Sequence, residues 1–600
     1  MLAGIIALGA ILRFWNLDLK PLWLDEVITA LLSLGRPYKD VPLEVVLPLS
    51  TLQQLFTLQP NVSCPEIAQA VASQSTHPPL FFCLMHQWLS WVEPLTQPLS
   101  WKLRALPALF GVSAIAAVYC LNRIAFSPTA GLMGAALMAV SPFGVYLSQE
   151  ARHYTLPILL ITLALLGLIQ IEHALYSQQL LARPIFWLFW GIVNSIGCYV
   201  HYFFILAFIA QLLTLTGLMY WRRWMLPKGS WLAVTLVVSG VAVSYLPWLP
   251  VLLGDTGRPE TEWLSKPEHI SPLYQTLVGW LLMVIALPVE EQSLWIQVPA
   301  ALLMIGFGSW VGWQGLRGLK QLLRQQSTQL ATFTLLCFTF CVLLQFVAII
   351  YLLGKDITVA PRYNFVYYPA VCALLGASLI PRGLQVSRLE VESSLELKAR
   401  RLKVKGLNQS SNLQSANIPP ATQTNLQPLT LLLFLSFLSC VFVVVNLVFL
   451  KPYNPQQVAQ DINQASAAPI MVVMGYKDFQ DVALGLSFAL AIDKLNPSVP
   501  NSTANPRGHG TAPAATSFAF LSRELGYDLV WQKLSKLSGL PVPRLNLWVI
   551  APGLKRRDYP QQLALSPQGT AAGIVGQTSC TIDPTQHHRI GIPYQLYRCE

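Results

Sequence analysis

Long apolar segments recur from the first residues of the chain to about residue 450, and they constrain the fold more than any other feature. A segment of about 20 apolar residues spans the hydrocarbon core of a bilayer, and a spanning backbone satisfies its own hydrogen bonds by forming a helix. Charged residues make up only 11% of the 600 residues, whereas soluble proteins carry roughly a quarter. The sequence therefore predicts an α-helical polytopic membrane protein.

Thirteen apolar runs are candidate spans, and two of them are weak. The candidates cover residues 2–15, 79–93, 103–125, 129–148, 154–175, 184–200, 203–221, 230–253, 273–289, 293–316, 328–353, 363–381 and 429–450. The run 79–93 is short and contains polar residues, and the run 273–289 ends in a proline followed by two glutamates. We expect about 11–13 transmembrane helices, with the two weak runs as outer juxtamembrane helices or re-entrant segments.

The basic residues set the orientation, because Lys and Arg concentrate in the cytoplasmic loops of membrane proteins. If the two weak runs do not cross and the N-terminus is cytoplasmic, the basic clusters between spans all face the cytoplasm. The opposite face then receives residues 16–102, 149–153, 201–202, 254–292, 354–362 and 451–600. We expect a multi-pass protein of a bacterial inner or plasma membrane, with its active site and its C-terminal domain outside the cytoplasm.

The composition changes after residue 381. Residues 382–428 are first basic and then rich in Asn, Gln, Ser and Pro, which predicts a cytoplasmic linker, and residues 429–450 form the last span. Residues 451–600 have the composition of a soluble domain, with strand-like runs at 470–474 and 545–550. We expect a small α/β domain there, in which Cys580 and Cys599 are candidates for a disulfide.

Charged and polar side chains gather at the predicted outer ends of the spans. They are Asp25, Glu26, His77, Glu150, Arg152, His153, Arg362 and Tyr363. Each alone also fits a helix end or a lipid-interface anchor, but arginines on the outer face run against the usual charge distribution. A guanidinium binds phosphate through paired hydrogen bonds, and a carboxylate accepts a proton from an attacking group. The set predicts group transfer from a lipid phosphate at the outer membrane surface.

The order of these motifs resembles membrane glycosyltransferases of family 39, which are relatives of protein O-mannosyltransferases and lipid A aminoarabinose transferases. The motifs are Trp23-Leu24-Asp25-Glu26, His77-Pro78-Pro79-Leu80, Arg104-Ala105-Leu106-Pro107-Ala108-Leu109, Gln149-Glu150-Ala151-Arg152-His153-Tyr154 and Arg362-Tyr363. The resemblance implies that residues 1–381 form a GT-C-like transmembrane catalytic domain. It also implies inverting transfer of a hexosyl or pentosyl group from a polyprenyl-phosphate sugar.

Carried over by position, the resemblance implies a role for each polar residue. Asp25 is the expected general base, with Glu26 and Glu150 as further catalytic carboxylates. The expected donor-binding and phosphate-binding residues are His77, Arg152, His153, Arg362 and Tyr363. The sequence lacks an Asp-x-Asp motif, so we expect no required cofactor, although a divalent metal ion stays a less favoured option.

The expected partners are a polyprenyl-phosphate-linked sugar, the lipid bilayer, and an acceptor that is a protein, a glycolipid or a polysaccharide. No nucleic acid is expected, because the basic residues of this chain of net charge +11 lie in short loops beside spans. A transporter or flippase of lipid-linked sugars is an alternative, but its ionisable groups would be expected inside the spans, which are nearly free of charge. A non-catalytic membrane scaffold is the third reading, and it leaves the outer polar cluster unexplained.

Overall fold

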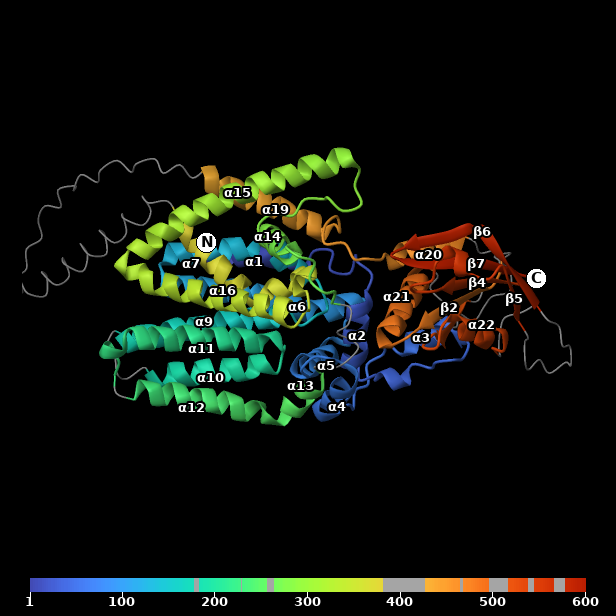
Figure 1. Ribbon diagram of the computed structural model, residues 1–600, viewed down its shortest axis with the longest axis horizontal. Coiled ribbons are helices and arrows are strands. Elements are labelled where there is room, and N and C mark those ends of the chain that lie inside the picture. The colour runs from blue at the N-terminus through green and yellow to red at the C-terminus, as the bar shows by residue number, and fades with distance from the viewer. Residues whose placement is uncertain are drawn as a thin grey trace, which may run out of the picture.

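The computed structural model describes residues 1–176, 183–227, 229–255, 264–380, 427–464, 468–495, 516–537, 544–565 and 578–600. A bundle of long helices forms one part of the molecule, and a sheet domain made from the C-terminal residues lies at one end of the bundle (Figure 1). The predicted fold class, a helical multi-pass membrane protein with a small C-terminal α/β domain, is confirmed. The predicted linker 382–428 falls almost wholly outside the described residues.

Among the described residues, six helices are long and apolar enough to cross a membrane. They are α6 (Leu99–Ala125), α9 (Thr155–Tyr176), α11 (Phe203–Trp221), the continuous stretch of α12 (Ser230–Tyr245) and α13 (Leu249–Asp255), α15 (Leu294–Arg324) and α16 (Gln326–Leu352). Five shorter apolar helices accompany them: α1 (Leu2–Phe14), α5 (Leu80–Val92), α10 (Arg183–Cys198), α17 (Tyr368–Ser378) and α19 (Gln427–Val444). The weak run 273–289 forms α14 (Ser271–Leu282), which belongs to neither group.

The apolar run 129–148 does not form the single helix that its length suggests. It splits into α7 (Pro128–Ala139) and α8 (Pro142–Ser148), which meet at an angle of 59°. Pro142 lacks the N–H that would continue α7, and its ring clashes with the preceding turn. The Arg13 guanidinium donates hydrogen bonds of 2.8 and 3.0 Å to the carbonyl oxygens of the last two residues of α7. The break turns the chain so that α8 ends directly at the Glu150 segment.

The C-terminal domain is built on a sheet with the strand order β1-β3-β2-β4-β7-β6-β5. Its strands are β1 (Leu47–Pro48), β2 (Ile470–Tyr476), β3 (Thr516–Ser522), β4 (Leu545–Ile550), β5 (Gln562–Leu565), β6 (Thr578–Ile590) and β7 (Ile592–Cys599). The central strand β2 runs parallel to β3 and β4, and α21 (Phe479–Leu495) and α22 (Tyr527–Ser535) pack on opposite faces of the sheet. Burial on both faces explains why β2 is apolar at successive positions.

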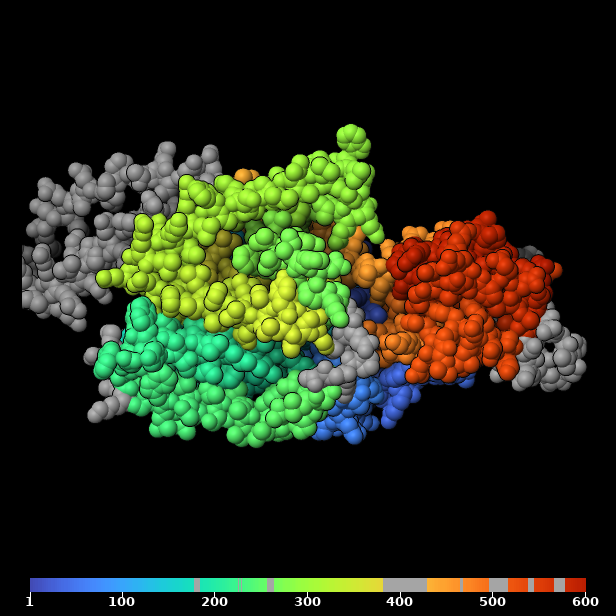
Figure 2. Space-filling model, in the orientation of Figure 1, coloured from blue at the N-terminus to red at the C-terminus, as the bar shows by residue number. Residues whose placement is uncertain are grey.

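The outer loop between α1 and α5 is joined to the C-terminal sheet. Leu47 of β1 pairs with Phe518 of β3, so a strand from the first tenth of the chain forms one edge of the sheet. The Ser487 hydroxyl of α21 donates a 2.6 Å hydrogen bond to the carbonyl oxygen of Leu22. Figure 2 shows the orange and red C-terminal domain meeting the helical bundle beside the blue N-terminal segments. The domain is therefore docked on the loop that leads into α2 (Leu24–Ser33).

Two disulfides lie in this outer region. One joins Cys580 to Cys599 across β6 and β7, as the sequence suggested, and the other joins Cys64 of α4 (Cys64–Gln74) to Cys83 of α5. The second pair was not foreseen, because Cys83 lies in an apolar run where cysteine reads as a small hydrophobic residue.

Candidate active site

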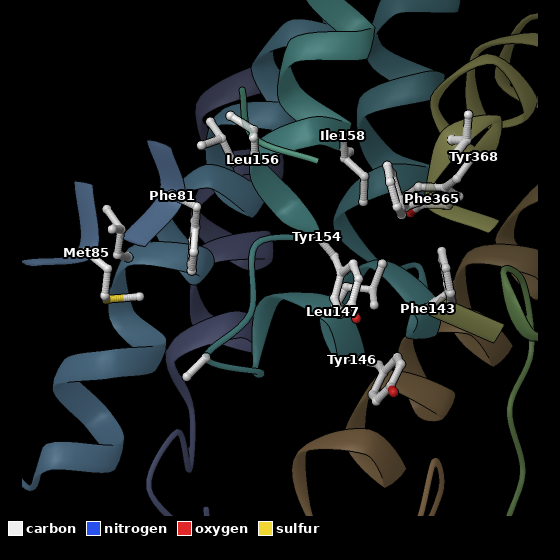
Figure 3. Close-up of a cluster of buried hydrophobic side chains, with 14 of the residues drawn as sticks. Phe81, Met85, Phe143, Tyr146, Leu147, Tyr154, Leu156, Ile158, Phe365 and Tyr368 are labelled. Atoms are coloured by element: carbon white, nitrogen blue, oxygen red, sulfur yellow. The ribbon is translucent and has the colours of Figure 1, made fainter. Parts of the chain in front are cut away.

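A cavity of about 650 Å³ lies where the outer ends of the helices meet the C-terminal domain. Its charged lining residues are Asp25, Arg152, Asp255, Lys355, Arg362 and Lys451. Buried aromatic side chains from distant parts of the chain form the packing behind it. Figure 3 shows Phe81 and Met85 of α5 on one side, Tyr154 in the middle, and Phe365 and Tyr368 on the other. Four cations against two carboxylates give the lining a net positive charge, which favours an anionic ligand.

Asp25 is held at the cavity wall by two arginines. It lies in the first turn of α2, and its Oδ2 atom is 3.5 Å from Nη2 of Arg362. Arg152 donates a 3.1 Å hydrogen bond from Nη1 to the backbone oxygen of Asp25 and one of 2.9 Å to the Thr29 hydroxyl. The Asp25 side chain keeps 17% of its surface exposed, so its carboxylate is open to the cavity. The motifs that contain Asp25, Arg152 and Arg362 therefore meet at Asp25.

Glu26, the neighbour of Asp25, is enclosed by protein. Its side chain is 1% exposed and forms two hydrogen bonds of 2.7 and 2.8 Å with the Arg104 guanidinium. It also accepts a 2.7 Å hydrogen bond from the backbone N–H of Ala151 and a 3.3 Å bond from that of Trp23. Burial opposes ionisation of Glu26, but the charge and hydrogen bonds of Arg104 outweigh it and lower the pKa of Glu26. Glu26 thus fixes α2 to the segment that carries Arg152.

His77 contacts Arg152 as a neutral ring. Its Nε2 atom lies 3.3 Å from Nη2 of Arg152, and its Nδ1 atom lies 3.0 Å from the Ser75 hydroxyl. Burial, together with the charges of Arg152 and Arg362, lowers the pKa of His77 well below 6.5. Because a guanidinium only donates, Nε2 accepts from Arg152 and Nδ1–H faces Ser75. His77 lines the cavity and orients Arg152 toward it.

His153 lies behind the cavity wall and is not one of its lining residues. Its ring is fully buried, with the ring centroids of His77 and His201 at 4.7 and 4.6 Å. Neither ring nitrogen has a hydrogen-bond partner within the described part of the chain. We therefore expect His153 to support the wall through His77 and His201, and its predicted contact with a donor has no support in this position.

Arg362 and Tyr363 also line the cavity, and both belong to the short helix η6 (Pro361–Val366). The Arg362 guanidinium carbon is 5.3 Å from the ring centroid of Trp23, and Tyr363 packs against Phe203 with ring centroids 4.8 Å apart. The aromatic contacts hold Arg362 beside Asp25. Arg362 and Arg152 thus present two guanidinium groups to the same space.

Glu150 faces a smaller cavity of about 240 Å³ that shares Trp23, Tyr146 and Lys451 with the larger one. Its Oε1 atom forms an ion pair with Nζ of Lys451. Lys451 and Tyr146 were missed from the sequence. The signal available for Lys451 was its position at the outer end of the last span, where a cation is usually interpreted as a lipid anchor.

Within the described ranges, no group of three or more His, Cys, Asp and Glu side chains is arranged to hold a metal ion. The Asp25 carboxylate in the cavity is paired with Arg362 instead. The expectation that no cofactor is required stays a prediction.

Residues 76–248 match the family described as dolichyl-phosphate-mannose-protein mannosyltransferase, and this match covers under a third of the chain. No curated protein sequence matches the chain.

The solved structures with distant similarity to this chain include three glycosyltransferases. ArnT from Cupriavidus metallidurans bound to undecaprenyl phosphate is 13% identical, covers 91% of this chain and 92% of its own, and has a TM-score of 0.47. The apo oligosaccharyltransferase of Archaeoglobus fulgidus is 14% identical over 81% of this chain and 63% of its own, with a TM-score of 0.43. The Pmt1-Pmt2 complex of S. cerevisiae bound to the sugar donor is 15% identical over 45% of this chain and 34% of its own, with a TM-score of 0.29.

The matched segment 76–248 contains three of the motifs on which the family resemblance rests, which begin at His77, Arg104 and Gln149. The resemblance of this multi-pass membrane protein to the family 39 mannosyltransferases is thereby confirmed for residues 76–248.

Proposed function

We propose that the protein is an inverting membrane glycosyltransferase that moves a sugar from a polyprenyl-phosphate donor to an acceptor outside the cytoplasm. One observation carries the proposal: the carboxylate of Asp25 and the guanidinium groups of Arg152 and Arg362 face the same cavity. A base beside two phosphate-binding cations is what transfer from a glycosyl phosphate requires. The match of residues 76–248 to a mannosyltransferase family supports the same reaction class.

In the proposed reaction, a hydroxyl or amine of the acceptor attacks the anomeric carbon of the sugar. Asp25 takes the proton of the attacking group, a new bond forms at the anomeric carbon, and the carbon–oxygen bond to phosphate breaks. Attack from the face opposite the leaving group inverts the anomeric centre. Polyprenyl phosphate departs with one more negative charge than it carried in the donor, and Arg152 and Arg362 stabilise that charge.

The remaining residues take supporting roles in this mechanism. Glu26 holds the Asp25 helix against the Arg152 segment, and His77 orients Arg152. Glu150 acts through Lys451, and Tyr363 lines the donor side. We propose that no metal ion is required, that the cavity opens outside a bacterial inner or plasma membrane, and that the acceptor is a protein, a glycolipid or a polysaccharide.

The variant Asp25→Asn tests the base. It removes the negative charge with little change of shape, so sugar transfer should fall by roughly 100-fold or more. The measurement is transfer from a polyprenyl-phosphate sugar by purified protein in vesicles, with thermal unfolding to show that the variant is folded. Asp40→Asn is the matched control, because Asp40 is an exposed aspartate of the same outer loop. Wild-type turnover by folded Asp25→Asn protein would exclude Asp25 as the base.

The variant Arg362→Ala tests the phosphate site. It should weaken binding of undecaprenyl phosphate by tenfold or more, because a hydrogen-bonded guanidinium is lost from the cavity. Affinity is measured by titration of the labelled lipid into full-length protein in nanodiscs. An unchanged affinity would make Arg362 an interface anchor that only packs on Trp23.

A further inference from the structure

We propose that Lys451 is a third ligand for the donor phosphate, and that the chain between the last span and the sheet domain is part of the active site. This inference rests on the proposed function and extends it. Lys451 belongs to the polypeptide that leaves α19 and enters α20 (Pro455–Gln464). Figure 1 shows this orange segment passing between the helical bundle and the C-terminal domain.

The lysine reaches both cavities. Its Nζ atom pairs with Oε1 of Glu150 and lies 3.2 Å from the Tyr146 hydroxyl. The same atom lies 4.0 Å from the ring centroid of Trp23. Trp23 also carries the Arg362 guanidinium at 5.3 Å, so one indole holds both cations at the cavity. The guanidinium carbon of Arg362 and the Nζ atom of Lys451 are therefore no farther apart than the sum of their distances to the Trp23 ring centroid.

The backbone around Lys451 is fixed. The ring of Phe449 stacks on Tyr146, with centroids 4.3 Å apart and an angle of 8° between the planes. The N–H of Leu450 donates a 2.8 Å hydrogen bond to Glu290, and the hydroxyl of Tyr453 accepts from the N–H of Leu24 at the start of α2. The side chain of Lys451 keeps 22% of its surface exposed. A fixed backbone with a partly exposed ammonium group places a cation where a ligand in the cavity can contact it.

The charge arrangement favours such a contact. Glu150 is 6% exposed in its side chain, and its Oε2 atom has no hydrogen-bond partner among the described residues. Within the described part of the chain, one oxygen of this carboxylate holds Lys451, and the ammonium also contacts the Tyr146 hydroxyl and the rings of Trp23 and Tyr146. A phosphate that leaves with two negative charges would attract Lys451 more strongly than this partner alone. Before a phosphate binds, the ion pair with Glu150 keeps the Lys451 ammonium group beside the cavity.

Binding of undecaprenyl phosphate to full-length protein in nanodiscs tests the assignment, with undecaprenol as the uncharged probe of the same chain length. Lys451→Met should weaken undecaprenyl phosphate binding by tenfold or more and leave undecaprenol binding unchanged. Lys555→Met is the matched control, because Lys555 is an exposed lysine of the C-terminal domain, and it should bind both probes as the wild type does. Wild-type affinity of Lys451→Met for undecaprenyl phosphate would overturn the proposal.

A second variant separates phosphate binding from neutralisation of a buried carboxylate. Lys451→Met leaves Glu150 without its cation, and this alone can distort the site or the fold. The double variant Glu150→Gln/Lys451→Met removes both charges, and we expect its affinity for undecaprenyl phosphate to stay tenfold or more below that of the wild type. Recovery of wild-type affinity in the double variant would show that Lys451 serves only Glu150, and would overturn the proposal.

Comparison with Arg362→Ala separates this inference from the proposed function. If Arg362→Ala weakens binding and Lys451→Met does not, the assignment of Lys451 fails and the phosphate site stands. If neither variant changes binding of undecaprenyl phosphate, both the phosphate site and the role of Lys451 are wrong.

Discussion

At the scale of single residues, the two adjacent carboxylates that follow the first span have different roles. Asp25 faces the cavity, whereas Glu26 is buried against Arg104 and the Ala151 N–H. Two adjacent carboxylates thus have different surroundings because successive helical residues point about 100° apart. The pattern in the sequence predicts the pair, but not which member is enclosed, because that depends on where Arg104 packs.

Removing the charge of Glu26 should destabilise the protein. In Glu26→Gln the Arg104 guanidinium stays buried without its counter-charge, and the free energy of unfolding should fall by about 3 kcal/mol. Thermal unfolding of the purified protein measures this change. Glu93→Gln, at the exposed end of α5, is the control and should unfold as the wild type does. An equal free energy of unfolding for Glu26→Gln and Glu93→Gln would show that the ion pair between Glu26 and Arg104 does not stabilise the fold.

The ion pair between Glu26 and Arg104 also predicts how the stability of the fold depends on pH. The pKa of Glu26 lies below its usual value of 4.5, because the effect of Arg104 outweighs the cost of burial. A carboxyl with a depressed pKa in the folded state stabilises the fold above its unfolded pKa, and that stabilisation is lost as pH falls through the folded pKa. Stability should therefore decrease below about pH 4.5, and the Glu26→Gln variant should lose less between pH 7 and pH 4 in thermal unfolding.

At the scale of elements, apolar length and strand pattern predicted the long spans and the strands β2 and β4. The break at Pro142 was missed because the total apolar length of 129–148 suits one span, although the proline was visible. Strand β1 has two residues and pairs with a partner hundreds of residues away, so no local pattern signals it. Lys451 was missed because a cation at a span end is usually an anchor. What the sequence does not reveal depends on contacts between distant segments.

The disulfide between Cys64 and Cys83 gives a prediction at this scale. It closes a loop with a sequence separation of 19 and ties α4 to α5. Replacing both cysteines by serine should lower the free energy of unfolding by about 3 kcal/mol, because the unfolded chain regains the entropy of the open loop. Thermal unfolding measures the loss, and Cys120→Ser, at a free and exposed cysteine, is the control. A double variant as stable as this control would show that the disulfide is dispensable.

At the scale of the whole molecule, the charge pattern assigns opposite sides of the membrane to two exposed positions. Lys555 belongs to the C-terminal domain, and Arg223 follows α11 in the short helix η2 (Arg223–Met225). In intact spheroplasts, a membrane-impermeant maleimide should label Lys555→Cys and should label Arg223→Cys only after lysis. The reverse labelling pattern would invert the predicted topology.

The strand pairing of Leu47 with Phe518 also determines when the molecule can be completed. Leu47 leaves the ribosome early, while its partner strand is made only after every described membrane helix. The cavity residue Lys451 is likewise synthesised after those helices. The nascent protein therefore spends most of its synthesis with an incomplete cavity, and the last part of translation both closes the sheet and completes the cavity lining.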